Sequence, residues 1–380
     1  MLRKTYLRRR LLQGIRDNRC GGRRQFLYRT AIQDRITVHQ ILVSDGRAAD
    51  KESYEIILGR GSGSKKPTRV IIDQDGGIDD ALALILALRS PELEVTAITA
   101  VSGNVTVEQA TLNGLRVVDL LNRGDVPVAR GLGNPLVRDA VRATSFHGKN
   151  GLGDSSLPRS RIPPAEKNAI DTISDELAIS KRRDLTIICT GPLTNIAALL
   201  TGFPESAKII KELVIMGGAY EVTEYGIGNV TPVAEFNIYA DPEAAKIVFE
   251  SRVPLTAIGL DVTTIPKNQL TLTDYADIRK RKARVTTFAA TILNKNIHKH
   301  RIFALHDPMT VATKIKPSLF EYASYKVQVE TRGEITAGMT VADRRESPPE
   351  GKTPDKRMKI CKSVDSRGFK RLFLDRLTGA

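Results

Sequence analysis

After residue 66, apolar runs of strand length alternate with segments of helical period, and no other feature constrains the fold as strongly. The first unit joins TRVIID to DDALALILALRSPE, and the second joins LEVTAITAVSGN to TVEQATLNGLRVVDLLNR. In the second unit Thr106 and Gln109 have the spacing of a capping box, so we expect a helix to begin close to Thr106. This alternation predicts an α/β fold with a mostly parallel, Rossmann-like sheet flanked by helices on both faces.

Further segments extend the same pattern. The later predicted strands are DVPVA, DLTIICT, ELVIMGG and PLTAIGL, and helices are expected in DPEAAKIVFE and in the 270s to 290s. YKVQVETRGEITAGMTVAD alternates with a period of two around a glycine turn, which predicts a C-terminal antiparallel hairpin on the sheet.

The chain divides into three predicted regions. Residues 1–66 are basic and end in the linker-like GRGSGSKKP, so we expect a disordered extension or a targeting segment. Residues 67–345 form the predicted domain, and residues 346–380 are expected to be an irregular basic tail that ends in a short helix. The first thirty or so residues are rich in arginine and poor in acids, as mitochondrial presequences are, so the predicted location is cytoplasmic with mitochondrial targeting as the alternative.

Charge and cysteine content exclude several classes of protein. The net charge of +15 comes largely from the two ends of the chain, so we predict no nucleic-acid partner. No apolar run reaches the roughly 18 residues that would suggest a membrane span. The three cysteines are widely spaced without a CxxC, which indicates neither a disulfide framework nor a thiolate zinc site.

Polar clusters follow the predicted strands, where open α/β sheets place their ligand sites. These clusters are DQDGGIDD, SGN, TGPLTN and GNVTPVAEFN, and LHD at residues 305–307 opens a further helix-like segment. Within VIIDQDGGIDDALAL, four aspartates lie within eight positions: Asp73, Asp75, Asp79 and Asp80.

Four carboxylates at close range raise each other's pKa unless a cation lies between them. Oxygen-only ligands suit Ca²⁺ or Mg²⁺, and the absence of a Cys/His cluster disfavours zinc. A simpler alternative is that Asp79 and Asp80 only cap a helix, where negative charge is favourable. A second alternative is the DxDG loop of haloacid-dehalogenase-type phosphatases, in which Asp73 would be the nucleophile and Asp75 the acid/base.

DQDGGIDDALAL resembles the DxDxGxDD signature of the nucleoside hydrolases, the inosine-uridine-preferring family that cleaves the N-glycosidic bond of ribonucleosides. Other segments agree with that family in order along residues 68–345: VSGNV, VPVARGLGNPLVR, FHGKNGLGD, TGPLTNIA, MGGAY, GNVTPVAEFNIYADPEAA and LHDP. The resemblance implies an enzyme of nucleoside catabolism or salvage that releases a free base and ribose.

The resemblance also implies a role for each matching residue. Asp75, Asp80, Asp307 and the backbone carbonyl of Thr190 would ligate a calcium ion, and Asp75 would take the proton from a calcium-bound water. The remaining roles that it implies are ribose binding by Asp79, Asn229, Glu235 and Asn237, a position beside the nucleophile for Asn104, and second-shell support from Asp73. His306 would protonate or hydrogen-bond the leaving base as an oxocarbenium-like transition state forms, and His147 would approach the same base.

Some features depart from the family pattern. Gln74 stands where threonine or valine is more familiar, and the chain has no tryptophan, which argues against stacking of purines between indoles. We expect a broad purine and pyrimidine range, with the base preference left open. Relatives commonly form dimers or tetramers, so a homodimer or homotetramer is expected.

Overall fold

The computed structural model describes residues 66–180, 183–345 and 357–379 with their side chains, and only the backbone of residues 16–20, 23–32 and 35–43. The chain forms two compact units, residues 1–64 and 65–380. In the first unit β1 (Arg16–Cys20), β2 (Arg23–Ile32) and β3 (Arg35–Val43) form an antiparallel sheet in the order β1-β2-β3, which was not predicted. Targeting by the arginine-rich start falls largely outside the described residues and gains no support from the structure.

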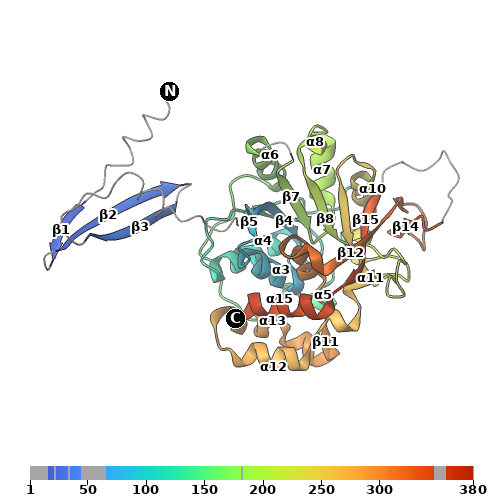
Figure 1. The fold of residues 1–380 in the computed structure, drawn as a ribbon. Helices are drawn as coiled ribbons and strands as arrows, with labels where there is room; N and C mark the ends of the chain where they lie inside the picture. Colours follow the sequence, from blue (N-terminus) through green and yellow to red (C-terminus); the bar gives the residue numbers. More distant parts are fainter. Residues whose placement is uncertain are drawn as a thin grey trace. The chain divides into compact units, whose positions relative to one another are not determined.

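The second unit is built on an eight-stranded sheet with the order β12-β15-β9-β8-β7-β4-β5-β6 (Figure 1). Its strands are β4 (Thr68–Gln74), β5 (Leu93–Ala100), β6 (Val128–Arg130), β7 (Leu185–Cys189), β8 (Glu212–Met216), β9 (Leu255–Ile258), β12 (Phe320–Tyr325) and β15 (Met358–Val364). All neighbouring strands are parallel except the β12–β15 pair. The predicted mostly parallel sheet is confirmed.

Helices cover both faces of this sheet. They are α3 (Ile78–Leu88), α4 (Val107–Leu120), α5 (Thr144–His147), α6 (Ala169–Ile179), α7 (Thr194–Gly202), α8 (Ser206–Ile209), α9 (Phe236–Ala240), α10 (Pro242–Glu250), α11 (Leu260–Thr263), α12 (Leu272–Lys280), α13 (Arg284–His300), α14 (His306–Ile315) and α15 (Ser366–Thr378). Short 3₁₀ turns lie at η1 (Pro266–Asn268) and η2 (Pro317–Leu319), and β10 (Leu270–Thr271) pairs with β11 (Ile302–Phe303). The expected start of α4 is confirmed, because Thr106 is its N-cap and accepts a hydrogen bond from the Gln109 N–H.

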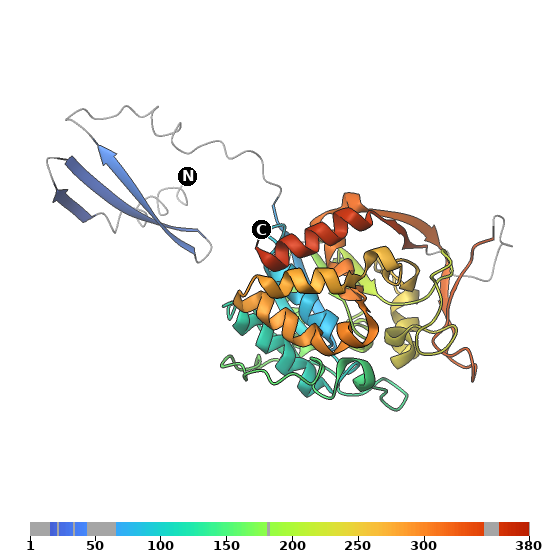
Figure 2. The same ribbon diagram turned by 90° about the horizontal axis from the view of Figure 1, so that it is seen from below.

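Alternate residues of each central strand enter different cores because side chains in a strand point to opposite faces. Val70 and Ile72 of β4 belong to the core that contains apolar residues of α3, α13, α14 and α15, whereas Ile71 belongs to the core that contains residues of α6, α7 and α10. Figure 1 shows α6 and α7 on one side of the sheet and α3 and α15 on the other, and Figure 2 shows α13 and α15 side by side. Both faces are thus buried, and polar ligands can reach the sheet only at the ends of its strands.

Two predictions at the C-terminal end need correction. Residues 358–364, expected to be irregular, form β15, because apolar Met358, Ile360 and Cys361 are buried between β9 and β12. The expected short helix at the end of the chain is α15. The predicted hairpin forms from β13 (Val327–Val329) and β14 (Thr340–Ala342), but as a separate two-stranded sheet and not on the central one.

Among the described residues, no helix has the length and apolar character needed to cross a bilayer.

Candidate active site

A cavity of about 800 Å³ opens beyond the carboxyl ends of the central strands. It is lined by most of the residues singled out from the sequence: Asp79, Asn104, His147, Thr190, Asn229, Glu235, Asn237, His306 and Asp307. The side chains of Asp73, Asp75 and Asp80 are buried and do not line it. The polar clusters that follow separate strands are therefore brought to one rim of the sheet, as expected.

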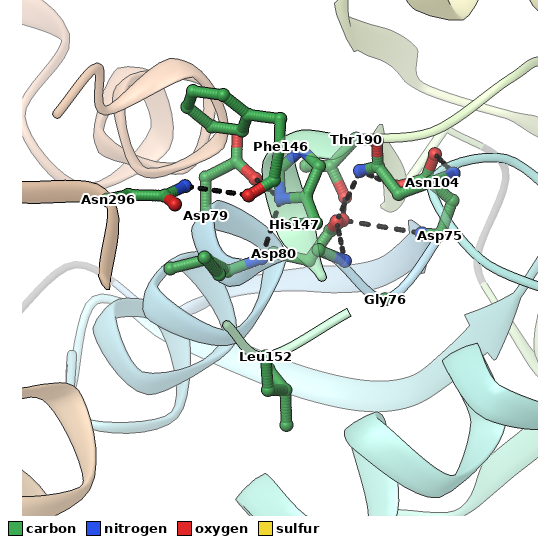
Figure 3. Close-up of polar contacts among 12 residues, drawn as sticks. Asp75, Gly76, Asp79, Asp80, Asn104, Phe146, His147, Leu152, Thr190 and Asn296 are labelled. Atoms are coloured by element: carbon green, nitrogen blue, oxygen red, sulfur yellow. Dashed lines mark hydrogen bonds and ion pairs between the residues drawn. The ribbon is translucent and has the colours of Figure 1, made fainter. Parts of the chain in front are cut away.

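The turn between β4 and α3 places Asp75 and Asp80 next to each other. Gly76 has φ +81°, a conformation that favours glycine, and a Cβ on it would lie 2.6 Å from the Cα atom of Ala110. The Asp80 carboxylate accepts hydrogen bonds from the Gly77 N–H at 2.7 Å and the Thr190 hydroxyl at 2.7 Å (Figure 3). These bonds connect the start of α3 to the loop after β7.

Asp75 is held by Asn104 from the loop after β5. The backbone N–H and the Nδ2 of Asn104 donate to the two carboxylate oxygens of Asp75, at 2.7 and 2.8 Å. Gly103 permits this approach, because a Cβ there would lie 2.0 Å from Oδ2 of Asp75. Burial raises the pKa of Asp75 well above its ordinary value, and the charge of Asp80 raises it further.

Asp79, Asp80 and Asp307 offer carboxylate oxygens that all lie within 4.8 Å of one another. All three side chains are buried. Burial followed by the charge of Asp80 raises the pKa of Asp79 to about 8, and burial followed by the charge of Asp79 raises the pKa of Asp307 well above its usual range. This cluster can hold a metal ion, which would remove the mutual repulsion. It shares Asp80 and Asp307 with the predicted ligand set but contains Asp79 where that set has Asp75.

Asp73 lies beneath the cluster and is fully buried. Its Oδ1 accepts hydrogen bonds from the Thr99 hydroxyl at 2.6 Å and the Asn195 side chain at 2.8 Å. Its backbone carbonyl accepts the Thr190 N–H at 2.7 Å, so Asp73 fixes the loop after β7. Burial raises the pKa of Asp73 to about 7.

The segment around α9 supplies the opposite wall of the cavity. Glu235 caps this helix by accepting from the N–H groups of Asn237 and Ile238, and also accepts from Gly218 at 3.0 Å. Asn237 donates through Nδ2 to the carbonyl of Thr190 at 3.0 Å. Asn229 is exposed, and its side-chain oxygen accepts the Phe236 N–H at 2.9 Å.

Two histidines line the cavity from α5 and α14. Nδ1 of His147 accepts the Ile78 N–H at 3.1 Å and lies 3.7 Å from Oδ1 of Asp79. Nδ1 of His306 lies 2.8 Å from the Thr263 hydroxyl. Burial lowers the pKa of His147 to about 3, with a further contribution from His306, and burial lowers the pKa of His306 to about 4.

Comparison with known proteins identifies the family. The sequence profile of the inosine-uridine preferring nucleoside hydrolases matches residues 70–371, which is most of the chain. The chain belongs to this nucleoside hydrolase family. It is a hydrolase that acts on N-glycosyl bonds, and the match extends through β15 into α15, beyond the predicted end of the domain at residue 345.

Individual relatives agree with this assignment. The pyrimidine-specific ribonucleoside hydrolase RihA of Escherichia coli (strain ED1a) is 42% identical over 315 residues, which are 81% of this chain and 97% of the relative. A plant nucleoside hydrolase of known structure is 32% identical with a TM-score of 0.74, covering 83% of this chain and 100% of the other. A purine-preferring ribonucleoside hydrolase from Gardnerella vaginalis is 35% identical with a TM-score of 0.73, covering 82% and 98%.

The phosphatase alternative is not favoured for this nucleoside hydrolase. It requires the Asp73 carboxylate as a nucleophile that reaches the substrate. That carboxyl group is 0% exposed, and Oδ1 is occupied by Thr99 and Asn195. The match of residues 70–371 to the nucleoside hydrolase family decides between the two interpretations.

Several residues of the nucleoside hydrolase site were not identified from its sequence. The cavity is also lined by Arg142, Phe146, Tyr239, Gln269, His300 and Ile302, and Asn195 supports Asp73. Most of these lie in loops or at helix ends without a recognisable spacing. Asn195 is an exception, because TGPLTN already placed it after a strand.

Proposed function

We propose that this nucleoside hydrolase cleaves the N-glycosidic bond of ribonucleosides of the inosine and uridine type, giving a free base and ribose. The observation that carries the proposal is the buried cluster of Asp79, Asp80 and Asp307 at the cavity beyond the strand ends. A cavity of about 800 Å³ is of the size that small ligands occupy in proteins.

We further propose that the metal is calcium. The donor set consists of carboxylate oxygen atoms that lie within 4.8 Å of one another, and oxygen atoms are the ligands that a hard divalent cation prefers. Asp75, Asp80, Asp307 and the carbonyl of Thr190 would hold it, with Asp79 alongside. When bound, the ion would lower the pKa of a water molecule and neutralise the carboxylates.

Asp75 is the general base in this proposal. The two hydrogen bonds from Asn104 fix the plane of its carboxylate, and the Asp75 N–H donates to Oδ1 of Asp80 at 3.3 Å. Asp75 takes the proton of the attacking water while the water oxygen bonds to C1′ of the ribose. Asn104 thereby acts as a positioning residue beside the nucleophile.

Ribose is held by Asp79, Asn229 and Asn237 at the cavity wall. Glu235 uses both carboxylate oxygens to accept backbone N–H groups, so its contribution to ribose binding is the placement of Asn237. Positive charge develops on the ribose ring as the glycosidic bond breaks, and nearby carboxylates stabilise it.

His306 and His147 face the leaving base as neutral imidazoles at neutral pH, since both pKa values are lowered. Nδ1 of His147 already accepts the Ile78 N–H, so the proton of the neutral ring is on Nε2 and can be donated as a hydrogen bond. We expect a range that includes purine and pyrimidine bases, a homodimer or homotetramer, and a role in nucleoside catabolism or salvage.

The test is ribose release by the purified chain from inosine, uridine, adenosine and guanosine. We expect activity that a chelator abolishes and added calcium restores. No ribose from any of these substrates, with folding and metal content verified, would disprove the proposed function.

A further inference from the structure

Among the described residues that line the cavity, Arg142 is the one lysine or arginine. Arg142 is half-buried, and its one hydrogen bond within the described residues runs from NH1 to the carbonyl of Val141, the preceding residue, at 2.8 Å. It forms no ion pair with a carboxylate in the part of the chain that the structure describes. A guanidinium stays charged at all physiological pH values and has five N–H donors, so most of its donors are left for a ligand.

The same loop contains a second arginine, whose guanidinium is already paired with a carboxylate. Arg138 forms a paired hydrogen-bond contact with the Glu243 carboxylate, at 2.8 and 2.9 Å, and also donates to the carbonyl of Thr331. Arg138 therefore anchors the loop to α10. Arg142, four residues later, has no carboxylate partner in the described part of the chain, and it lines the cavity.

The backbone that follows Arg142 is fixed at two points. The Ala143 N–H donates to the carbonyl of Asn104 at 3.2 Å, and the Asn296 side chain on α13 donates to the carbonyl of Phe146 at 2.8 Å (Figure 3). The Phe146 side chain also lines the cavity and is 37% exposed, which gives an apolar surface close to the cation in sequence. An apolar ring together with a cation suits a planar, polar ligand such as a nucleobase.

We propose that Arg142 binds the nucleobase and stabilises the negative charge that it acquires as it leaves. This inference rests on the proposed function. When the bond between C1′ and the base nitrogen breaks, its electron pair stays on that nitrogen and delocalises onto the ring oxygens. The water oxygen bonds to C1′, its proton goes to Asp75, and the released base takes a proton from solvent.

This role also defines a substrate class. A guanidinium donates best to carbonyl oxygens that gain charge, so Arg142 favours bases with a carbonyl group, as in uridine and inosine, over adenosine, whose base has none. Arg142 is thus a catalytic and specificity-determining residue, distinct from the groups that hold ribose and metal.

The experiment compares leaving groups. Wild type, Arg142→Gln, Arg142→Lys and the control Arg130→Gln are assayed on uridine, inosine, adenosine and 4-nitrophenyl β-D-ribofuranoside, whose leaving group needs no stabilisation. Arg130 is exposed at the end of β6, with its nearest carboxylate on Glu108 at 3.5 Å. We expect Arg142→Gln to lower kcat/KM for uridine and inosine by about 10- to 100-fold, the range for a lost charge-assisted hydrogen bond, and to change the nitrophenyl riboside by less than about 3-fold.

Arg142→Lys should retain most of the activity, and Arg130→Gln should match wild type. An equal loss of kcat/KM on all substrates, including the nitrophenyl riboside, would overturn the proposal. It would show that Arg142 acts on ribose binding or on the shape of the cavity and not on the leaving base. Weaker inhibition by uridine 5′-monophosphate without a change in uridine turnover would also overturn it, in favour of a phosphate-binding role. If wild type releases ribose and Arg142→Gln is equally active, this inference alone fails; if wild type releases none, the proposed function fails.

Discussion

Replacement of Asp73 by asparagine tests the electrostatics beneath the active site. Asparagine keeps the oxygen that accepts from Thr99 and Asn195. It exchanges the second oxygen, which has no hydrogen-bond partner among the described residues, for an uncharged NH₂ group. The variant therefore removes a buried negative charge and keeps the shape and the main contacts of the side chain.

The magnitude follows from the pKa of Asp73, which burial raises from 3.8 to about 7. Between about pH 4 and pH 7 the folded state keeps a proton that the unfolded state has released, so the stability of the wild type falls as the pH rises. A shift of about three pKa units corresponds to about 4 kcal/mol at most, and the loss is complete above the folded pKa. Asp73→Asn lacks this titration.

Urea unfolding of wild type and Asp73→Asn, followed by circular dichroism at pH 5, 6, 7 and 8 in chelator, measures the effect. At pH 5 we expect the variant to match wild type or to be less stable by up to about 2 kcal/mol, because the buried NH₂ group has no acceptor. By pH 8 the difference should shift in favour of the variant by about 2–4 kcal/mol. A difference that stays constant from pH 5 to pH 8 would refute a raised pKa for Asp73.

Four further predictions concern the site itself. Asp75→Ala should lower kcat by more than about 100-fold through loss of the general base, and near wild-type turnover would show that another group accepts the proton. Asn104→Ala should lower kcat by about 10-fold or more with a smaller change in KM, because it removes one of the bonds that orient Asp75; calorimetry should show calcium still binding. Gly103→Ala should abolish activity and weaken calcium binding, because its Cβ would lie 2.0 Å from Oδ2 of Asp75, whereas Gly202→Ala, with nothing within 4 Å, should behave as wild type. Removal of calcium should lower the melting temperature more at pH 8 than at pH 5, because the carboxylates release their protons as the pH rises; equal shifts would argue against binding at these groups.

The central strands were predictable from sequence because each is an apolar run buried on both faces. Val70, Ile71 and Ile72 are all 0% exposed, so nothing in their environment interrupts the run. The strands β12 and β15, at one edge of the sheet, were harder to predict from sequence. In β12 and β15, exposed residues such as Glu321 and Lys359 interrupt the pattern, and pairing across residues 326–357 depends on contacts that are distant in sequence.

Asp75, Asn104 and Thr190 could be placed at one edge of the sheet from sequence because they closely follow β4, β5 and β7, and the ends of parallel strands meet at one edge. Residues in loops, whose side chains can point either into the cavity or away from it, were not identified from sequence. Arg142 and Arg138 lie four positions apart in one loop, and only the structure shows that Arg138 pairs with Glu243 while Arg142 lines the cavity. No local sequence pattern separates these two arginines.

The aspartates of the β4–α3 turn are divided by what already occupies their oxygens. Asn104 donates to both oxygens of Asp75, and Gly77 and Thr190 donate to those of Asp80, so these two carboxylates have fixed orientations before any ligand binds. Oδ1 of Asp79 has no donor within the described residues and its side chain lines the cavity, so it gains most from a ligand. The fixed pair suits a metal ion and an attacking water, which need constant geometry, and the free oxygen suits a ribose hydroxyl, which arrives and leaves in every turnover.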